Sequence, residues 1–208
     1  MNKVKVSCLI NDLSNLKFIT NTFADKQHEN SVRDIFIKNG LSPIDKNNDK
    51  YKYLIDISNS LKEVDVLKDD CIFIEQPFGS QMCPDFIVCV DGFIMWIECK
   101  SGSGIITWNT GSPKTNILFV FSCKKMNTTT LFFGQHHKII QNNPEFEKKY
   151  ELFDKELKKI ATEKFNNLFG DNNNSSFYMR RMFNDSTKYS NILIRADFFQ
   201  KVKLLLDI

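Results

Sequence analysis

Hydrophobic positions in the middle of the chain fall in short runs that predict β-strands. Two apolar runs, residues 86–90 and 93–97, are separated by Asp91-Gly92. Asp-Gly readily adopts the two positive φ angles of a type I′ turn, so the segment predicts a β-hairpin with a two-residue loop. Counting back along the ladder from this turn places Asp85 opposite Glu98, with their Cβ atoms roughly 4.5–5.5 Å apart.

The rest of the chain divides into further strands and helices by the same criteria. Strands are expected at residues 71–75, within 115–122, at 131–133 and at 191–194, with the apolar run in 115–122 suited to a buried central strand. Residues 1–40 are expected to be mostly helical, with one helix over 24–38 that ends at Asn39-Gly40; helices are also expected over 53–68, 145–169 and 196–206. Residues 41–52, 101–114 and 171–176 are expected to be loops.

The helix over 145–169 has Pro144 at its start and Gly170 at its end, as is typical of helix boundaries. Its apolar residues recur at spacings of three and four, which predicts an amphipathic helix whose stripe faces the core. That stripe consists of Phe146, Tyr150, Phe153, Leu157 and Ile160.

These elements predict an α/β (α+β) fold, with a central mixed five-stranded sheet that contains the antiparallel hairpin and is flanked by helices. The 208 residues are expected to form a single domain. Within it, residues 1–70 form a mostly helical part, 71–135 the sheet core, and 136–208 a helical and basic part.

Three charged groups gather at the open end of the predicted hairpin. The two-residue period of a strand places Lys100 on the same face as Glu98, close to Asp85, and turns Cys99 to the opposite face. Two close carboxylates repel each other unless a cation lies between them. Magnesium suits such a site, because it binds through one or two carboxylates and keeps water and phosphate oxygens as its other ligands. Lys100 is then placed to orient or deprotonate an attacking water.

A chance surface cluster is the alternative interpretation of these three residues. Glu-x-Lys recurs at 147–149 and 156–158, where the surroundings indicate a solvated helix. Only one of the five prolines precedes an aspartate, however, and the apolar strands and the register-fixing turn accompany the charged residues. The context therefore favours a site.

Pro84-Asp85 followed by Glu98-x-Lys100 resembles the motif of the PD-(D/E)XK nucleases, and its surroundings are similar to type II restriction endonucleases. The resemblance covers roughly residues 71–135. It implies a restriction-endonuclease-like fold and magnesium-dependent hydrolysis of DNA to a 5′-phosphate and a 3′-hydroxyl. It also implies that Asp85 and Glu98 bind Mg²⁺ with the backbone carbonyl of Cys99, and that Lys100 serves the attacking water.

Many members of that superfamily place a glutamate from an early helix beside the metal. Glu29, in the helix over 24–38, is the matching residue, and an ordinary exposed glutamate is the alternative. For His28 and Arg33, which lie nearby in the same helix, a surface role is expected.

Polar and basic residues of the loops are candidates for DNA contact, because amide and cationic side chains recognise base edges and phosphates. These are Gln81, Asn109, Lys114, Lys124, Lys125, Asn127, Arg180 and Arg181. Lys188 lies in the same basic region as the two arginines, among aromatic residues. Each is equally explained as a solvated surface residue. His136-His137 is not expected to bind zinc, since neighbouring residues of an extended chain project to opposite sides.

The amino-acid composition says more about the cellular compartment of the protein than about its function. A net charge of +3 is only mildly basic, so any contact with DNA must come from local patches. The six cysteines contain no CxxC pair and several fall in apolar strands, as expected of a protein in the reduced cytoplasm. No apolar run approaches the roughly 18 residues of a membrane helix.

The sequence thus predicts a type II restriction endonuclease that cleaves double-stranded DNA as a homodimer, without a membrane partner. A gene for a cognate DNA methyltransferase is expected beside its own. Two alternatives remain open: a nuclease of the same superfamily that acts in DNA repair or junction resolution, and a DNA-binding module without catalytic activity.

Overall fold

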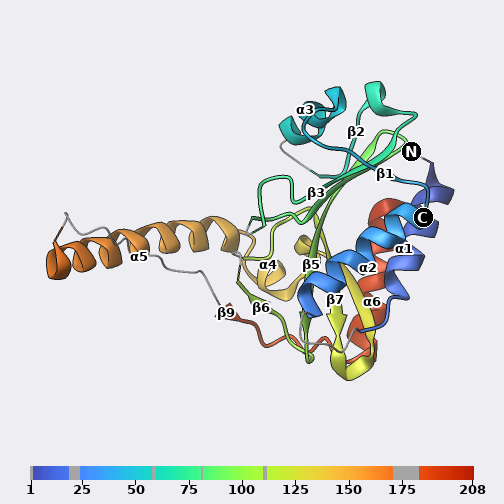
Figure 1. The fold of residues 1–208 in the computed structure, drawn as a ribbon. Helices are drawn as coiled ribbons and strands as arrows, with labels where there is room; N and C mark the ends of the chain where they lie inside the picture. Colours follow the sequence, from blue (N-terminus) through green and yellow to red (C-terminus); the bar gives the residue numbers. More distant parts are fainter. Residues whose placement is uncertain (1, 19–23, 58–59, 81, 110–111, 171–182) are drawn as a thin grey trace.

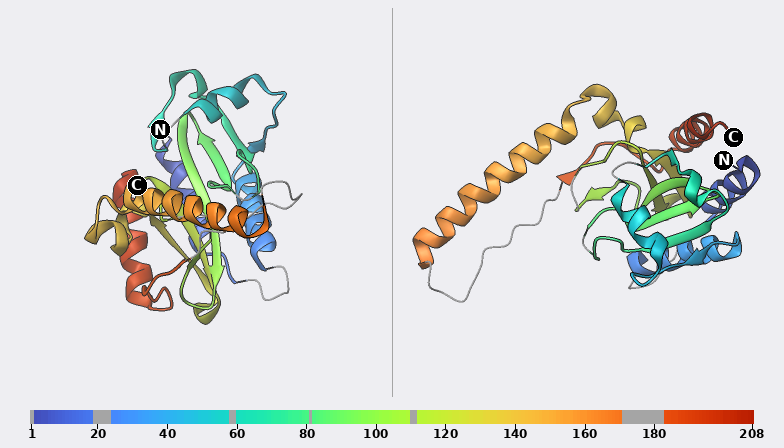
Figure 2. Two further views of the ribbon diagram at one scale, coloured as in Figure 1. Left: turned by 90° about the vertical axis from the view of Figure 1, so that its left-hand side faces the viewer. Right: turned by 90° about the horizontal axis from the view of Figure 1, so that it is seen from above.

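A mixed β-sheet forms the centre of the molecule, and helices lie on its faces (Figures 1 and 2). The computed structural model describes residues 2–18, 24–57, 60–80, 82–109, 112–170 and 183–208. The chain has the mixed α/β architecture that the sequence predicts, and the apolar runs of the sequence form the main strands of the sheet.

The predicted hairpin forms in the predicted register. Strand β4 (Phe86–Val90) pairs antiparallel with β5 (Phe93–Gly102), with Phe86 opposite Ile97 and Val90 opposite Phe93. Both turn residues have positive φ, 48° at Asp91 and 81° at Gly92, as a type I′ turn requires.

Five strands make up the body of the sheet, in the order β3, β4, β5, β7 and β8. The other three of these strands are β3 (Cys71–Glu75), β7 (Ile117–Cys123) and β8 (Thr128–Phe133). All neighbours are antiparallel except β5 and β7, which are parallel. Strand β7 is buried along its whole length, as expected, but it lies between β5 and the edge strand β8, so that β5 and not β7 is the middle strand of the five.

The prediction of five strands is incomplete, because two short strands bring the sheet to seven. Strand β1 (Ser42–Pro43) extends the edge beside β3, in a segment predicted to be a loop. Strand β2 (Lys62–Glu63) pairs with the start of β5, in a segment predicted to be a helix. A helix does form nearby, α3 (Asp49–Asp56), and Asn48 caps it by accepting a hydrogen bond from the Lys50 backbone. A two-residue strand carries too little periodicity to be recognised in a sequence.

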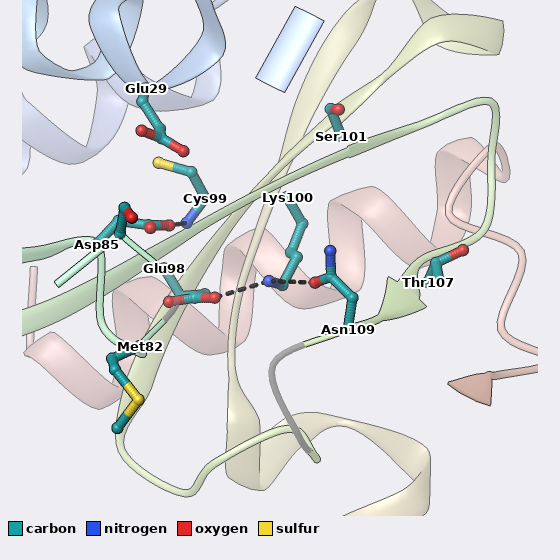
Figure 3. Close-up of a pocket in the computed structure, with 10 residues that line it drawn as sticks. Glu29, Met82, Asp85, Glu98, Cys99, Lys100, Ser101, Thr107 and Asn109 are labelled. Atoms are coloured by element: carbon teal, nitrogen blue, oxygen red, sulfur yellow. Dashed lines mark hydrogen bonds and ion pairs between the residues drawn. The ribbon is translucent and has the colours of Figure 1, made fainter. Parts of the chain in front are cut away.

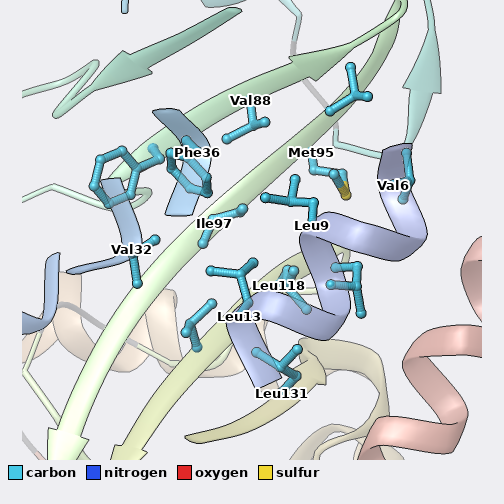
Figure 4. Close-up of a cluster of buried hydrophobic side chains, with 14 of the residues drawn as sticks. Val6, Leu9, Leu13, Val32, Phe36, Val88, Met95, Ile97, Leu118 and Leu131 are labelled. Carbon is cyan, nitrogen blue, oxygen red and sulfur yellow. The ribbon is translucent and has the colours of Figure 1, made fainter. Parts of the chain in front are cut away.

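Three helices cover one face of the sheet: α1 (Lys3–Ser14), α2 (Ala24–Lys38) and α6 (Ile192–Leu206). The apolar sides of α1 and α2 meet alternate residues of β4 and β5, as Figure 4 shows for Leu9, Phe36 and Ile97. The helix α2 has the predicted bounds. The other face is covered by α3 over one half and by a second aromatic cluster around Trp108, Phe119 and Phe132 over the other.

The last helix contradicts one prediction. Residues 191–194 were expected to form a strand, but α6 begins at Ile192. Its N-cap is Asn191, whose side chain accepts a hydrogen bond from the Leu193 backbone. The spacing of apolar residues in this short segment is compatible with a helix or a strand, and the N-cap favours the helix.

The helix α5 (Phe146–Phe169) ends at Gly170 as predicted, but its apolar stripe does not face the core. In Figures 1 and 2, α5 extends away from the sheet as an arm. Phe153 is 57% exposed and Ile160 56% exposed, so the prediction that the stripe faces the core is wrong for these distal residues. At the base of the helix, Phe146 and Tyr150 are half-buried and contact Phe183. Amphipathic spacing reports that a face is apolar and does not report what covers it.

Two short elements lie beside the main sheet. Strand β6 (Thr107–Trp108) pairs antiparallel with β9 (Phe183–Asn184) in a separate ribbon, within the segment predicted to be a loop. Helix α4 (Lys138–Asn142) follows β8 and a turn of 3-10 helix. Among the described residues, no helix is both long and apolar enough to cross a membrane.

Candidate functional site

The open end of the hairpin forms the floor of a cavity of about 290 Å³. Asp85 precedes β4 and lies across from Glu98 and Cys99 of β5. Its Oδ2 atom accepts a hydrogen bond of 2.7 Å from the backbone N–H of Cys99. The register of the hairpin thus fixes the Asp85 carboxylate against the strand that carries Glu98 and Lys100.

Glu98 and Lys100 form a buried ion pair in this cavity. The Lys100 Nζ atom lies 2.7 Å from Glu98 Oε1, and the two side chains are 10% and 2% exposed. Nζ also donates to Oδ1 of Asn109 at 3.3 Å (Figure 3). Asn109, predicted to contact DNA, therefore lies beside the ammonium group and lines the cavity.

Glu29 reaches the same cavity from α2. In Figure 3 its carboxylate points toward Cys99 and Asp85. The neighbouring residue, His28, is only 3% exposed, and its Nε2 atom lies 2.8 Å from the Val120 carbonyl oxygen of β7. The expected surface role of His28 is therefore wrong: the ring joins α2 to the sheet directly beside Glu29. His28 and Glu29 lie in the same helical turn, and the spacing of apolar residues does not show which of the two contacts the core.

The local charges perturb the ionisation of Asp85 strongly. Burial, the Glu98 charge and the Glu29 charge together raise the pKa of Asp85 to about 8, although the Cys99 N–H and Lys100 act in the opposite direction. Burial alone lowers the pKa of Lys100, but the Glu98 carboxylate outweighs it and the net pKa is raised. Lys100 is thus an ammonium ion at neutral pH, whereas Asp85 is largely protonated.

Cys83 also belongs to the site, and sequence reasoning missed it. Burial raises the pKa of its thiol, and the Glu98 carboxylate, to which the thiol donates a hydrogen bond, raises the pKa further. The available signal was its position, directly before Pro84-Asp85. Ser80, Met82, Ser101 and Thr107 complete the lining of the cavity.

The donor set fits a hard divalent cation in chemistry. Among the described residues, no group of three or more His, Cys, Asp or Glu side chains is arranged to hold a metal ion by itself. Magnesium, however, binds through one or two carboxylates and completes its shell with water and substrate oxygens. Asp85 and Glu98 supply that number. The pKa of Asp85 is raised by burial and then by the negative charges of Glu98 and Glu29, and a bound cation would favour the ionised form.

The predicted DNA-contacting residues fall into separate places. Gln81, Arg180 and Arg181 lie outside the described residues. Lys114 is paired with α5, because its Nζ atom lies 3.3 Å from Glu147 and 3.5 Å from Glu151. The charge of Lys114 therefore holds the base of the helical arm.

Lys124, Lys125 and Asn127 lie together in and just after the 3-10 turn that follows β7. Asn127 has a φ of 48°, a left-handed conformation that asparagine tolerates well, so the turn alone accounts for this residue type. Lys125 lines a second cavity of about 210 Å³ with Lys188, Ser103 and Ser190. The 101–107 segment borders both cavities, so the two lie on neighbouring parts of one surface.

A different buried carboxylate, Asp185, is fully provided with donors. Its Oδ2 atom accepts a hydrogen bond of 2.6 Å from Trp108 Nε1 and lies 3.3 Å from His137 Nε2, while Oδ1 accepts one of 2.7 Å from the Thr187 backbone. Burial alone raises the pKa of Asp185, but the hydrogen bonds from His137 and Trp108 outweigh it and lower the pKa. His137 belongs to this network of buried side chains.

Comparison with family models, with curated proteins and with solved structures finds no match to this chain. The arrangement of the residues themselves must therefore suggest the function.

Proposed function

We propose that the chain is a magnesium-dependent endonuclease that hydrolyses phosphodiester bonds in double-stranded DNA, of the type II restriction class. The observation that carries the proposal is the buried cluster of Asp85, Glu98 and Lys100 at the open end of the hairpin. The order and chemistry of these residues are those of the PD-(D/E)XK nucleases that the sequence resembles. A fold of the restriction-endonuclease type is part of the same proposal.

Asp85, Glu98 and the backbone carbonyl of Cys99 are the groups that would hold Mg²⁺. When bound, Mg²⁺ supplies positive charge for the scissile phosphate and lowers the pKa of a coordinated water. The protein contributes a rigid frame, because the Cys99 N–H fixes Asp85 and the strand β5 fixes Glu98. Glu29 stands beside Asp85, where its negative charge further favours a cation.

Lys100 acts as a cation in this scheme and not as a base. Its raised pKa keeps the ammonium protonated at neutral pH, so it is suited to orient the attacking water and to offset negative charge on the phosphate in the transition state. Water attacks phosphorus and gives up a proton to the solvent, the bond from phosphorus to the 3′ oxygen breaks, and this oxygen takes up a proton from the solvent. The products carry a 5′-phosphate and a 3′-hydroxyl.

The DNA backbone has a suitable surface beside the cavity. Lys125 and Lys188 line the second cavity with two serine hydroxyls and without a carboxylate among its lining residues. Lysines and hydroxyl groups are common phosphate ligands in protein–DNA contacts. Asn109 lies at the border of the catalytic cavity, where an amide reaches either the scissile phosphate or a base edge.

With one site per 24.2 kDa chain, cleavage of both strands of a palindrome favours a two-fold homodimer. Its setting would be the cytoplasm, where the six free cysteines stay reduced. No membrane partner is needed, and a DNA methyltransferase encoded nearby would protect the host.

The test is incubation with a sequenced plasmid, with Mg²⁺ or with a chelator, followed by mapping of the ends. Discrete fragments with 5′-phosphates that require Mg²⁺ are expected. Cleavage confined to branched or damaged DNA would instead support a role in repair or junction resolution. DNA binding without cleavage of any of these substrates would contradict a nuclease and support a binding module.

The matched control is the second Glu-x-Lys segment, Glu156 to Lys158, on the exposed face of α5. Glu98→Gln should abolish cleavage, whereas Glu156→Gln should leave it unchanged. Equal loss in both variants would remove the support for a site at the hairpin.

A further inference from the structure

Four large apolar side chains of α5 lie exposed along one side of the helix. They are Phe153, Leu157, Ile160 and Leu168, with exposed fractions of 57%, 39%, 56% and 69%. These four residues are called the α5 stripe below. Their spacing of four, three and eight residues places them on one helix face. An exposed apolar patch of a few hundred Å² is often a site of protein interaction.

We propose that the α5 stripe is a homodimer interface, in which it packs against the α5 stripe of a second copy of this chain, with the two helices antiparallel. The proposal does not rest on the nuclease function. If both hold, the pairing joins two sites into one two-fold particle.

The charge of α5 favours a second copy over a nucleic acid. The helix carries six lysines and five acidic residues, so it is nearly neutral. Three ion pairs at a spacing of four residues further offset these charges: Lys149 with Glu145, Lys158 with Asp154, and Lys159 with Glu163. A DNA-binding helix presents an excess of positive charge along one face. A nearly neutral helix with an exposed apolar face can instead pack against the same helix of a second copy without strong charge repulsion.

The arm is held in a position that a partner can reach. Its first turns are tied to the body by Lys114, which pairs with Glu147 and Glu151. From there the 24 residues extend for about 36 Å at 1.5 Å per residue. Figures 1 and 2 show the distal part of the helix well away from the sheet.

Lys164 decides the direction of the pairing. It lies four residues after Ile160 and four before Leu168, within the line of the stripe. In a parallel pair, identical residues meet, and Lys164 would face the partner's Lys164 with like charge. An antiparallel pair centred between Leu157 and Ile160 opposes these two residues to each other and sets Lys164 against the partner's Phe153. A lysine is favourable over an aromatic ring.

The available area matches a modest interface. If each stripe side chain offers on the order of 100 Å², about half of a large apolar side chain, then two stripes bury about 800 Å². The aliphatic stems of flanking lysines and glutamates bring this to roughly the 1,000 Å² that a specific interface needs. A dissociation constant on the order of 1 µM is therefore expected.

Sedimentation velocity over a range of protein concentrations, without DNA or metal, tests the proposal. The wild-type chain should sediment as a dimer at concentrations well above 1 µM, and Leu157→Glu should weaken the dimer by at least roughly tenfold, since it buries a charge. Lys164→Leu should strengthen it by about tenfold, because it completes the apolar seam.

The matched control is Leu152→Glu. Leu152 is on the same helix and 60% exposed, but lies about 140° around the axis from Leu157. This variant should dimerise like the wild type, and circular dichroism of both variants should show equal helix content. A wild-type chain that is monomeric at about 100 µM would overturn the proposal, as would equal weakening by Leu157→Glu and Leu152→Glu. Because neither DNA nor metal enters the experiment, its failure would remove the homodimer but leave the cleavage chemistry proposed for Asp85, Glu98 and Lys100 untouched.

Discussion

Two buried aspartates in this molecule have opposite surroundings. Asp185 receives hydrogen bonds from Trp108 and Thr187 and faces His137, and its pKa is lowered. Asp85 lies against Glu98 and Glu29, receives one backbone hydrogen bond, and has a pKa raised to about 8. Burial is common to both. The difference lies in whether the protein itself supplies the positive partners.

This contrast separates a structural carboxylate from a functional one. A buried anion whose donors are all in place stabilises the fold and has no need of another ligand. A buried carboxyl group whose pKa is raised by burial and by neighbouring carboxylates destabilises the fold when it is ionised, and such groups are typical of active sites. Asp185 therefore belongs to the frame that holds Trp108 and, next to it, Asn109. Asp85 belongs to the site that a cation would complete.

The largest expected effect is the loss of cleavage when a charged residue of the candidate site is replaced. Asp85→Asn, Glu98→Gln and Lys100→Ala should each lower the cleavage rate by at least roughly 1,000-fold, because each removes charge placed at the scissile phosphate. Initial rates on plasmid DNA with saturating Mg²⁺ would measure this. An Asp185→Asn variant that loses as much activity while remaining fully folded would break the contrast.

The next effect is on stability at the satisfied carboxylate. Asp185→Ala should lower the free energy of unfolding by about 3 kcal/mol, since it leaves Trp108 Nε1 and His137 without their buried acceptor. Denaturant unfolding at pH 7 would measure the change. Because the folded-state pKa is lowered, the contribution of Asp185 is present above its ordinary pKa and is lost as the pH falls through the folded value. A variant as stable as the wild type would contradict this account.

At the candidate site, replacing the buried carboxyl group is expected to raise the free energy of unfolding and not to lower it. Asp85→Asn should raise the free energy of unfolding of the metal-free protein by about 2 kcal/mol at pH 8, although it abolishes cleavage. For a carboxyl group whose pKa rises to about 8 on folding, the stabilising contribution is full below the ordinary pKa of 3.8 and is lost as the pH rises toward 8. The wild type should therefore lose stability between these values more steeply than the variant. Thermal unfolding across this pH range would measure both, and parallel curves would argue against the raised pKa.

The smallest effect concerns the lysines of the second cavity. Lys125→Ala and Lys188→Ala should each weaken DNA binding uniformly across sequences and reduce the salt dependence of the binding constant by a slope of about 1. Fluorescence anisotropy with a duplex at several salt concentrations would measure it. Lys62→Ala, a change at an exposed lysine of β2, serves as the control. Unchanged slopes in both cavity variants would remove this surface from the DNA-binding face.

Much of the fold could be predicted because local chemistry determines it. Asp91-Gly92 sets the turn, and the turn sets the register that brings Asp85, directly before β4, against the end of β5 that carries Glu98 and Lys100. The stop at Gly40 and the apolar spacing of α2 likewise gave the helix that carries Glu29. In each case a few neighbouring residues contain the signal for the element, whereas the position of Glu29 beside Asp85 depends on how α2 packs on the sheet.

The wrong predictions have a common cause: each concerns a feature that depends on contacts with residues distant in the sequence. Strands β1 and β2 exist because longer strands pair with them, and two residues alone carry no period. His28 is buried because β7 offers it a carbonyl oxygen, and the face of α5 is exposed although its spacing is that of a core helix. The Cys83 thiol was missed because its partner, Glu98, is distant along the chain.

Calorimetric titration of the wild-type chain with Mg²⁺ at pH 7, repeated in buffers of different ionisation enthalpy, tests the central claim most directly. If Asp85 and Glu98 hold the cation, binding should release close to one proton at pH 7, because Asp85 is largely protonated in the metal-free site. The release should disappear above pH 9, and Asp85→Asn should neither bind Mg²⁺ in the millimolar range nor release a proton. Equal heats and equal proton counts for the wild type and Asp85→Asn would contradict a metal site at the hairpin.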